Sequence, residues 1–366
     1  MNQAHQAAPR VTMVLPCHNE AEFLPALLEA LLPQVAAQPG WRLVAVDDSS
    51  TDTTGSILDA AARGATALRV IHGAFGSPGA ARAAGAAAVT VLGHGAPPDW
   101  LLTIDCDVEV PPDFVSGWQA RISEVHGDDG VGALNGGEDQ QHLFRGLPNA
   151  QRAGAKFGEA AGRSEAAVGI VNLNGVNHAV RTTAYLTAGP YEQPTMVGPD
   201  GEVNLAGEDW DLGVRLRLAG FRIDECAVTV RDRGRRLLAD VTAYLTGEAY
   251  EGAFRRVSAT SEQADLDEVT ATEIGERTVE RVLVHFFFKI VLADPSLLDG
   301  DIGLTAPTVA AMREWIARWP SPTFTQSRHG FVYGRLPRFA AAFTADVRHQ
   351  LGLARGAADP QVSQEH

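Results

Sequence analysis

Four short apolar segments alternate with helical segments near the start of the chain, and this alternation constrains the fold more than any other feature. The apolar segments are Val11 to Leu15, Leu43 to Val46, Leu68 to Ile71 and Trp100 to Ile104. Each has the length and composition of a buried strand, and leucine or alanine recurs at helical spacing between them. Repeated strand–helix units predict an α/β fold with a mostly parallel sheet flanked by helices.

Polar side chains follow these strands at the points where the strands end. They come after the first, second and fourth strands: His18, Asn19 and Glu20, then Asp47 and Asp48, then Asp105 and Asp107. In open α/β sheets, ligands bind beyond the carboxyl ends of the strands. We therefore expect a binding site at this edge of the sheet.

Two of these acids, Asp105 and Asp107, are separated by a single residue. On an extended chain, side chains two residues apart point to the same side. The two carboxylates can flank one hard cation that phosphate oxygens also hold, as Mg²⁺ or Mn²⁺ prefers. The alternative is a polar loop that caps the helix after Pro111 and Pro112. Their position at the end of a buried strand favours a divalent-cation site.

Asp47 and Asp48 directly follow the second strand. A carboxylate there can accept a hydrogen bond from a base N–H or a ribose hydroxyl, although turn and cap residues account for part of this segment. Arg82 stands in the first turns of the third predicted helix, within a glycine-rich segment from Gly73 to Gly85. It can face a phosphate there, and an arginine on the helix surface is the alternative.

A second acidic cluster opens a predicted helix that ends at Gly220. Acids in a first turn are favoured by the helix dipole, so capping explains some of this cluster. Asp211 is spaced to pair with Arg215 four residues later. Glu208 and Asp209 stand at the mouth of the helix, where a carboxylate can reach an acceptor hydroxyl and serve as a general base.

Four segments carry a family resemblance when they are taken in order: residues 11–20, 46–52, 105–107 and 207–216. Their order and spacing resemble the family-two glycosyltransferases with the GT-A fold, over about residues 10–235. The resemblance implies transfer of a sugar from a nucleotide-sugar, often a UDP-sugar, with inversion at the anomeric carbon. It also implies a divalent cation, Mg²⁺ or Mn²⁺, as cofactor.

The resemblance assigns roles to individual residues. It implies a nucleoside pocket lined by Pro16, His18, Glu20 and either Asp47 or Asp48. Asp105 would contact the nucleotide, and Asp105 and Asp107 together would hold the metal. In the Glu-Asp pair, Glu208 and Asp209 are the catalytic candidates, with Asp209 as the base.

Basic and acceptor-facing residues complete this expected site. Arg82, Arg233 and Arg236 are expected at the diphosphate, with a solvated basic loop as the alternative for the latter two. Asn177, His178 and Trp210 are expected near the acceptor. For Asn177 and His178 the alternative is a turn or strand residue without a direct role.

The sequence departs from the family at two positions. In the family, an asparagine usually follows the arginine that ends the glycine-rich segment, but this chain has Ala83 after Arg82. Many relatives carry a histidine after the strand that follows the Glu-Asp helix, but this region reads Val230 to Arg236 without one. Either Asp232 substitutes as a metal ligand, or the metal keeps additional waters.

The charge and the cysteine content limit which partners and which cellular compartment we expect. Lys and Arg number 30 against 45 Asp and Glu, a net charge of −15, which argues against a nucleic-acid partner. Three separated cysteines without a Cys-x-x-Cys pair argue for a reducing, cytoplasmic setting. The most apolar run, residues 282–293, is shorter than the ~20 residues that cross a bilayer, so we expect no integral membrane segment. The oligomeric state stays open.

The motifs also suggest how the chain is divided. We expect a flexible N-terminus, a GT-A catalytic domain with nucleotide-binding and acceptor halves, a mainly helical region and a flexible tail: residues 1–10, 11–240 (11–110 and 111–240), 241–355 and 356–366.

Three functions are weighed at this point. A transferase would move sugar to a small-molecule or carrier-bound acceptor. A nucleotidyltransferase that makes nucleotide-sugars shares the α/β sheet and paired acids, but it opens with a Gly-rich basic loop where this chain has Pro16 to Glu20. A non-catalytic protein that binds a nucleotide-sugar would not need the intact acids at 105, 107, 208 and 209.

Overall fold

The computed structural model describes residues 8–90, 97–155, 173–192, 195–197, 203–205, 208–233, 265–272, 295–300 and 305–317. Most of the predicted helical region 241–355 lies outside these ranges, which include only η3 (Pro295–Asp299), α11 (Ala306–Ala317) and the start of one further helix. Residues 1–7 and the predicted tail 356–366 also lie outside them. Among the described helices, none combines the length and apolarity that crossing a membrane requires.

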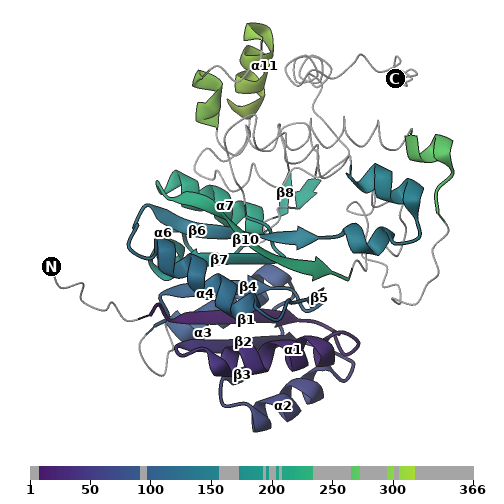
Figure 1. Ribbon diagram of the computed structural model, residues 1–366. Helices are drawn as coiled ribbons and strands as arrows, with labels where there is room; N and C mark the ends of the chain where they lie inside the picture. Colours follow the sequence, from purple (N-terminus) through teal and green to yellow (C-terminus); the bar gives the residue numbers. More distant parts are fainter. Residues whose placement is uncertain are drawn as a thin grey trace.

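An eight-stranded sheet forms the centre of the molecule (Figure 1). Its strands are β1 (Val11–Cys17), β2 (Trp41–Asp48), β3 (Leu68–Gly73), β4 (Trp100–Ile104), β5 (Val108–Glu109), β6 (Val131–Asp139), β7 (Asn177–Arg181) and β10 (Arg222–Asp232). They lie in the order β3-β2-β1-β4-β7-β6-β10-β5. A separate antiparallel pair is formed by β8 (Thr195–Val197) and β9 (Val203–Leu205).

Strand directions confirm the predicted fold class. The strands β3, β2, β1 and β4 run parallel, as do β6 and β10. The exceptions are β7, which is antiparallel to both β4 and β6, and the edge strand β5. The ends of β1, β2, β4, β6 and β10 therefore meet at one edge of the sheet, together with the start of β7.

Helices cover both faces of the sheet. One face packs against α1 (Leu24–Ala37), α2 (Thr54–Gly64) and α4 (Phe114–Val125), and the other packs against α3 (Pro78–Thr90), α6 (Thr182–Ala188) and α7 (Glu208–Leu218). The alternation of side chains along β1 shows why both layers form. Met13 and Leu15 pack in the hydrophobic cluster that contains residues of α1, α2 and α4. Val14, between them, packs on the opposite face in a cluster with α3.

Helix α3 lies unusually close to the sheet at Gly85. A Cβ atom at this position would overlap the side chain of Val14 and press on Val46. Glycine weakens an exposed helix, so its presence inside this one is explained by the close approach. The approach brings Arg82, one turn earlier on α3, to the end of β4.

Candidate active site at the strand ends

The loops after β1 and β2 are joined by hydrogen bonds between side chains and backbone. The ring Nδ1 of His18 lies 2.5 Å from the carbonyl of Asp48. The side-chain oxygen of Asn19, a residue with φ of 55°, accepts hydrogen bonds from the amides of Thr51 (2.6 Å) and Asp52 (3.2 Å). The amide of Glu20 donates to the hydroxyl of Thr54 at 2.7 Å. This side of the expected nucleoside pocket is therefore preformed.

Asp47 and Asp48 are both buried, and each holds a different neighbouring segment. The Oδ1 atom of Asp48 accepts the amides of Phe75 (2.6 Å) and Gly76 (3.0 Å), which fixes the glycine-rich segment. The Oδ2 atom of Asp47 lies 2.9 Å from Nδ1 of His72. Hydrogen bonds to Asp47 and then to Asp59 raise the pKa of His72.

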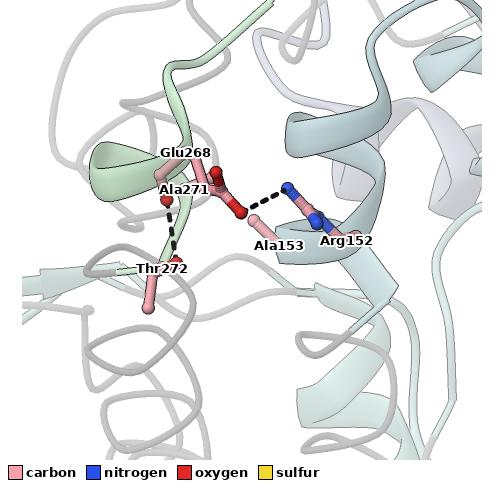
Figure 2. A pocket seen from close by; sticks show the side chains of 5 residues that line it. All are labelled: Arg152, Ala153, Glu268, Ala271 and Thr272. Carbon is pink, nitrogen blue, oxygen red and sulfur yellow. Dashed lines mark hydrogen bonds and ion pairs between the residues drawn. The ribbon is translucent and has the colours of Figure 1, made fainter.

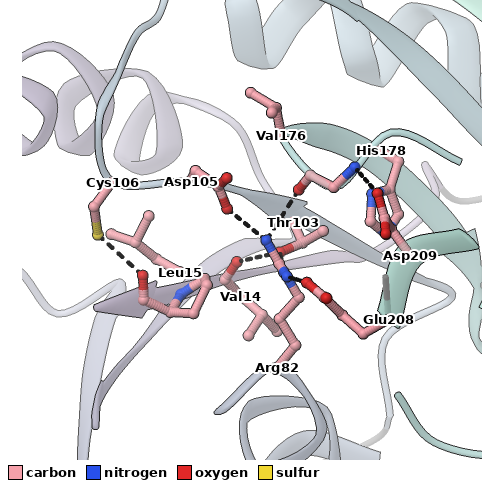
Figure 3. A network of polar contacts seen from close by, with 12 residues as sticks. Val14, Leu15, Arg82, Thr103, Asp105, Cys106, Val176, His178, Glu208 and Asp209 are labelled. Atoms are coloured by element: carbon pink, nitrogen blue, oxygen red, sulfur yellow. Dashed lines mark hydrogen bonds and ion pairs between the residues drawn. The ribbon is translucent and has the colours of Figure 1, made fainter. Parts of the chain in front are cut away.

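Arg82 occupies the centre of the site, where its guanidinium joins segments from distant parts of the sequence (Figure 3). Its side chain is 2% exposed and forms ion pairs with Glu208 and with Oδ1 of Asp105, the latter at 2.5 Å. Its Nη2 also donates to the carbonyl of Gly175 at 3.1 Å, and its Nε donates to the hydroxyl of Thr103 at 3.2 Å.

Two carboxylates keep this buried guanidinium charged. Burial lowers the pKa of Arg82, but the charges of Asp105 and Glu208 outweigh that effect, and the net shift is upward. A buried cation without such partners would carry a large desolvation cost. The contacts of Arg82 are with Asp105, Glu208, Gly175 and Thr103, and its expected role at the diphosphate stays a prediction.

Asp209 is fixed by the loop that precedes β7. Its Oδ2 accepts the amide hydrogen of Gly175 at 2.7 Å. The neighbouring Asn174 donates its side-chain amide to Oε2 of Glu138 (3.2 Å) and accepts the amide of Val176 (3.0 Å), so the loop is itself anchored. Arg82 therefore holds the catalytic candidate Glu208, and the amide of Gly175 holds Asp209. The carbonyl of Gly175 also accepts a hydrogen bond from Arg82.

The third acid of this cluster has the structural role that its spacing predicted. Asp211 has an exposed fraction of 0% and pairs with Arg215 at 2.7 Å. Arg215 also donates to the carbonyls of Ala188 and Pro190, which ties α7 to the end of α6. Burial raises the pKa of Asp211 to about 6, although Arg215 opposes the shift.

Asn177 and His178 lie fully inside the protein. The side-chain amide of Asn177 donates to the carbonyl of Val228 at 2.9 Å. His178 lies between the carbonyl of Asn174 (2.6 Å) and the hydroxyl of Tyr191 (2.8 Å), and burial lowers its pKa to about 3. These placements speak against direct contact with an acceptor. The side chain of Trp210, the third acceptor candidate, lies outside the described part of the chain.

Two arginines after β10 were expected at the diphosphate. The described ranges include Arg233, whereas Arg236 lies outside them. The Arg233 guanidinium lies 3.4 Å from Glu109 and 5.6 Å from the ring centre of Phe23. It helps to line a hollow of about 210 Å³ between α1 and β5. Its position near Asp107 is set by the backbone, where the amide of Arg233 donates to the carbonyl of Asp107.

The surroundings of Asp232 bear on whether it can replace the family's histidine as a metal ligand. The side-chain amide of Gln140 donates to Glu138 at 2.5 Å and to Asp232 at 3.0 Å. Burial, and then the charge of Asp232, raise the pKa of Glu138 to about 8. Asp232 therefore forms a half-buried carboxyl pair with Glu138. Within the described ranges, no group of three or more His, Cys, Asp or Glu residues is arranged to hold a metal ion.

Several important residues escaped the sequence reasoning. Glu138 and Asn174 carry no local signal, because their partners lie far away in sequence. Asn19 was among the polar residues expected at this edge of the sheet, but its hydrogen bonds to the loop after β2 were not anticipated. A second hollow, of about 200 Å³, lies between the helix at 148–155 and residues 268–272, where Arg152 pairs with Glu268 (Figure 2). None of the predicted site residues lines it.

Comparison with protein families finds one match that bears on the site. Residues 12–151 match the family described as Glycosyl transferase family 2, which confirms the resemblance seen in the sequence over that segment. The matched residues include the loops after β1 and β2, Arg82, Asp105 and Asp107, whereas Glu208 and Asp209 lie beyond them. No curated protein sequence matches the chain.

Three solved structures are similar to the chain at low sequence identity. The mannosyltransferase PcManGT from Pyrobaculum calidifontis, in complex with GDP-Man and Mn²⁺, is 17% identical, with 94% of this chain and 87% of that one covered and a TM-score of 0.43. TarS 1–349 from S. aureus is 14% identical, with 95% and 93% covered and a TM-score of 0.44. Glucosyl-3-phosphoglycerate synthase from Mycobacterium tuberculosis, with Mg²⁺ and UDP, is 15% identical, with 76% and 80% covered and a TM-score of 0.40.

Proposed function

We propose that this chain, a glycosyltransferase by its family 2 segment at residues 12–151, transfers a sugar from a nucleotide-sugar to an acceptor hydroxyl. The proposed donor is a UDP-sugar, and the proposed acceptor is a small molecule or is bound to a carrier. The observation that carries the proposal is the meeting of Asp105, Glu208 and the peptide that binds Asp209 around one buried arginine. Donor and acceptor can react only where such segments converge.

Asp105 and Asp107 would hold a divalent cation, Mg²⁺ or Mn²⁺. Both are hard oxygen ligands, and the side chain of Asp105 is 31% exposed at the end of β4. Mg²⁺ commonly takes one or two carboxylates and completes its coordination with phosphate oxygens and water, so a two-acid site fits. When bound, the cation would supply positive charge beside the departing diphosphate.

Asp209 is the proposed general base. Its carboxylate is fixed by the Gly175 amide and by its place in the first turn of α7, and a base needs a fixed position within hydrogen-bond reach of the proton. In a single displacement, the acceptor hydroxyl gives its proton to Asp209 while its oxygen attacks the anomeric carbon. The bond to the diphosphate breaks on the opposite side, so the anomeric configuration inverts.

Glu208 has a different proposed role from its neighbour. Its carboxylate pairs with Arg82, and the side chain is only 12% exposed. We infer that Glu208 acts as a positioning residue, which fixes the start of α7 and therefore the direction of Asp209. Arg82 would act in the same way on Asp105.

A panel of UDP-, GDP- and dTDP-sugars tests the proposed reaction, with Mn²⁺ or Mg²⁺ present and release of the nucleoside diphosphate as the measurement. Release from one donor is expected, and Asp209→Asn should lower turnover by about 10²–10⁴-fold while UDP binding persists. Full turnover in this variant would contradict the base assignment. Pyrophosphate release from a nucleoside triphosphate and a sugar phosphate would favour a nucleotidyltransferase. No release from any donor would favour a binding protein.

A further inference from the structure

Two buried thiols lie side by side at the edge of the sheet where the candidate site is formed. Cys17 ends β1, and Cys106 follows β4 between Asp105 and Asp107. The two strands pair in parallel with Val14 opposite Thr103, so each cysteine follows its strand partner by the same three residues. Their exposed fractions are 1% and 2%, and neither is in a disulfide.

The distance between these sulfur atoms is the decisive observation. The Sγ atoms are 2.9 Å apart, and the bond length of a disulfide is about 2.05 Å, so roughly 0.9 Å separates contact from bonding. The Cys106 thiol also lies 3.2 Å from the carbonyl of Pro16, the residue before Cys17 at the end of β1.

We propose that Cys17 and Cys106 form a reversible disulfide, and that this pair is a covalent modification site of the protein. The oxidant is a peroxide. The sulfur of one thiol, after loss of its proton, attacks a peroxide oxygen, the O–O bond breaks, and a sulfenic acid and water result. The second sulfur then attacks the sulfenic sulfur, the S–O bond breaks, and the departing hydroxide takes up the second thiol proton. Two thiols lose two electrons and two protons, and one hydrogen peroxide becomes two waters.

The surroundings of Cys17 and Cys106 explain why the dithiol form persists and why the thiols are oxidised slowly. In a reducing compartment the dithiol form predominates, and disulfides that form there are usually transient. Both thiols are almost fully buried, so a peroxide reaches them slowly and oxidation is slow. Once one sulfur is oxidised, the second is already within reach, and this favours the disulfide over further oxidation.

The bond would change the site as well as the thiols. It would join the end of β1, beside His18, to the segment that carries Asp105 and Asp107. Because the bond closes a long loop of the chain, the oxidised protein should unfold at a higher temperature than the reduced protein. A second consequence rests on the proposed function: moving Cys106 toward β1 shifts the cation ligands, so Mn²⁺-dependent UDP binding weakens.

Thiol counting after peroxide treatment tests the modification in the full-length protein. In denaturant, the titratable thiols should fall from three to one, and dithiothreitol should restore them. Digestion without reductant should yield one peptide that joins Cys17 to Cys106 and is lighter by the mass of two hydrogen atoms. Retention of all thiols, or their loss without this joined peptide, would overturn the proposal.

Two variants provide matched controls. Cys226→Ser removes the third thiol, which lies on β10, and should still form the joined peptide with no thiol remaining. Cys17→Ser should yield no joined peptide under the same treatment; if it does not fold, the peptide map of the native sequence decides alone. Calorimetry with UDP and Mn²⁺ then compares oxidised with reduced protein. Unchanged affinity after complete oxidation would refute the coupling to the site, while the disulfide is judged by the thiol count.

Discussion

Contacts of different kinds hold the two sides of the candidate site. On the expected donor side, in the loops after β1 and β2, side-chain oxygens of Asn19, Thr54 and Asp48 accept separate hydrogen bonds from backbone amides. On the catalytic side, Asp105, Glu208 and Gly175 all depend on the one guanidinium of Arg82. The donor side should therefore lose its order gradually, whereas the catalytic side should fail at a single point.

Replacement of Arg82 is the sharpest way to break this contrast. Arg82→Met should destabilise the fold by about 1–3 kcal/mol, because the partly buried carboxylates of Asp105 and Glu208 lose their partner. Turnover should be lost, since Asp105 and the loop that binds Asp209 are released together. Thermal unfolding and nucleotide release measure the two effects. Arg82→Lys is the control: it keeps the charge but cannot span both acids, so it should recover part of the stability. Wild-type stability in Arg82→Met would contradict the shared dependence.

Asp107 lies where the two sides meet, so its loss should affect donor binding without releasing Arg82. Asp107→Asn should weaken Mn²⁺-dependent UDP binding by at least about tenfold, because even groups behind a metal ligand contribute roughly 10–100-fold. Calorimetry with and without Mn²⁺ provides the comparison. Equal UDP affinity of the variant and the native protein in Mn²⁺ would remove Asp107 from the cation site.

Asn19 tests the donor side alone. Asn19→Gly removes its hydrogen bonds but keeps the positive φ, and it should cost about 1 kcal/mol. Asn19→Ala adds backbone strain and should cost about 1–2 kcal/mol more. Both variants should raise the KM for the donor and leave kcat nearly unchanged. A fall in kcat comparable to that of Arg82→Met would show that the two sides are not independent.

The effect expected at Glu138 differs from the others because it depends on pH. The folded-state pKa of Glu138 is raised to about 8 from an ordinary value of 4.5, so its contribution to stability is present below pH 4.5 and is lost as pH rises through 8. Glu138→Gln removes this dependence. Melting temperatures at pH 5 and pH 8 should therefore fall less with pH in the variant than in the native protein. Parallel curves would contradict the raised pKa.

The sequence predicted one side of the site better than the other. The strands β1 to β4 fall within about two residues of their expected ends, because apolar runs and local helix spacing report on local structure. The ion pair of Asp211 with Arg215 was also predictable from spacing within one helix. The contacts of Arg82 were not, since its partner Glu208 lies 126 residues away and an alanine-rich helix gives no sign of which face is buried. The antiparallel direction of β7, which buries Asn177 and His178, was missed for the same reason.

The glycine at position 85 has a consequence for how the chain tolerates change. Any side chain there would push α3 away from Val14, and Arg82 would move with the helix. In a library that samples every amino acid at each position of α3, we expect position 85 to be depleted almost as strongly as position 82, although it carries no functional group. A residue without a side chain would then rank among the most constrained in the molecule, because it sets the depth at which a neighbouring charge is buried.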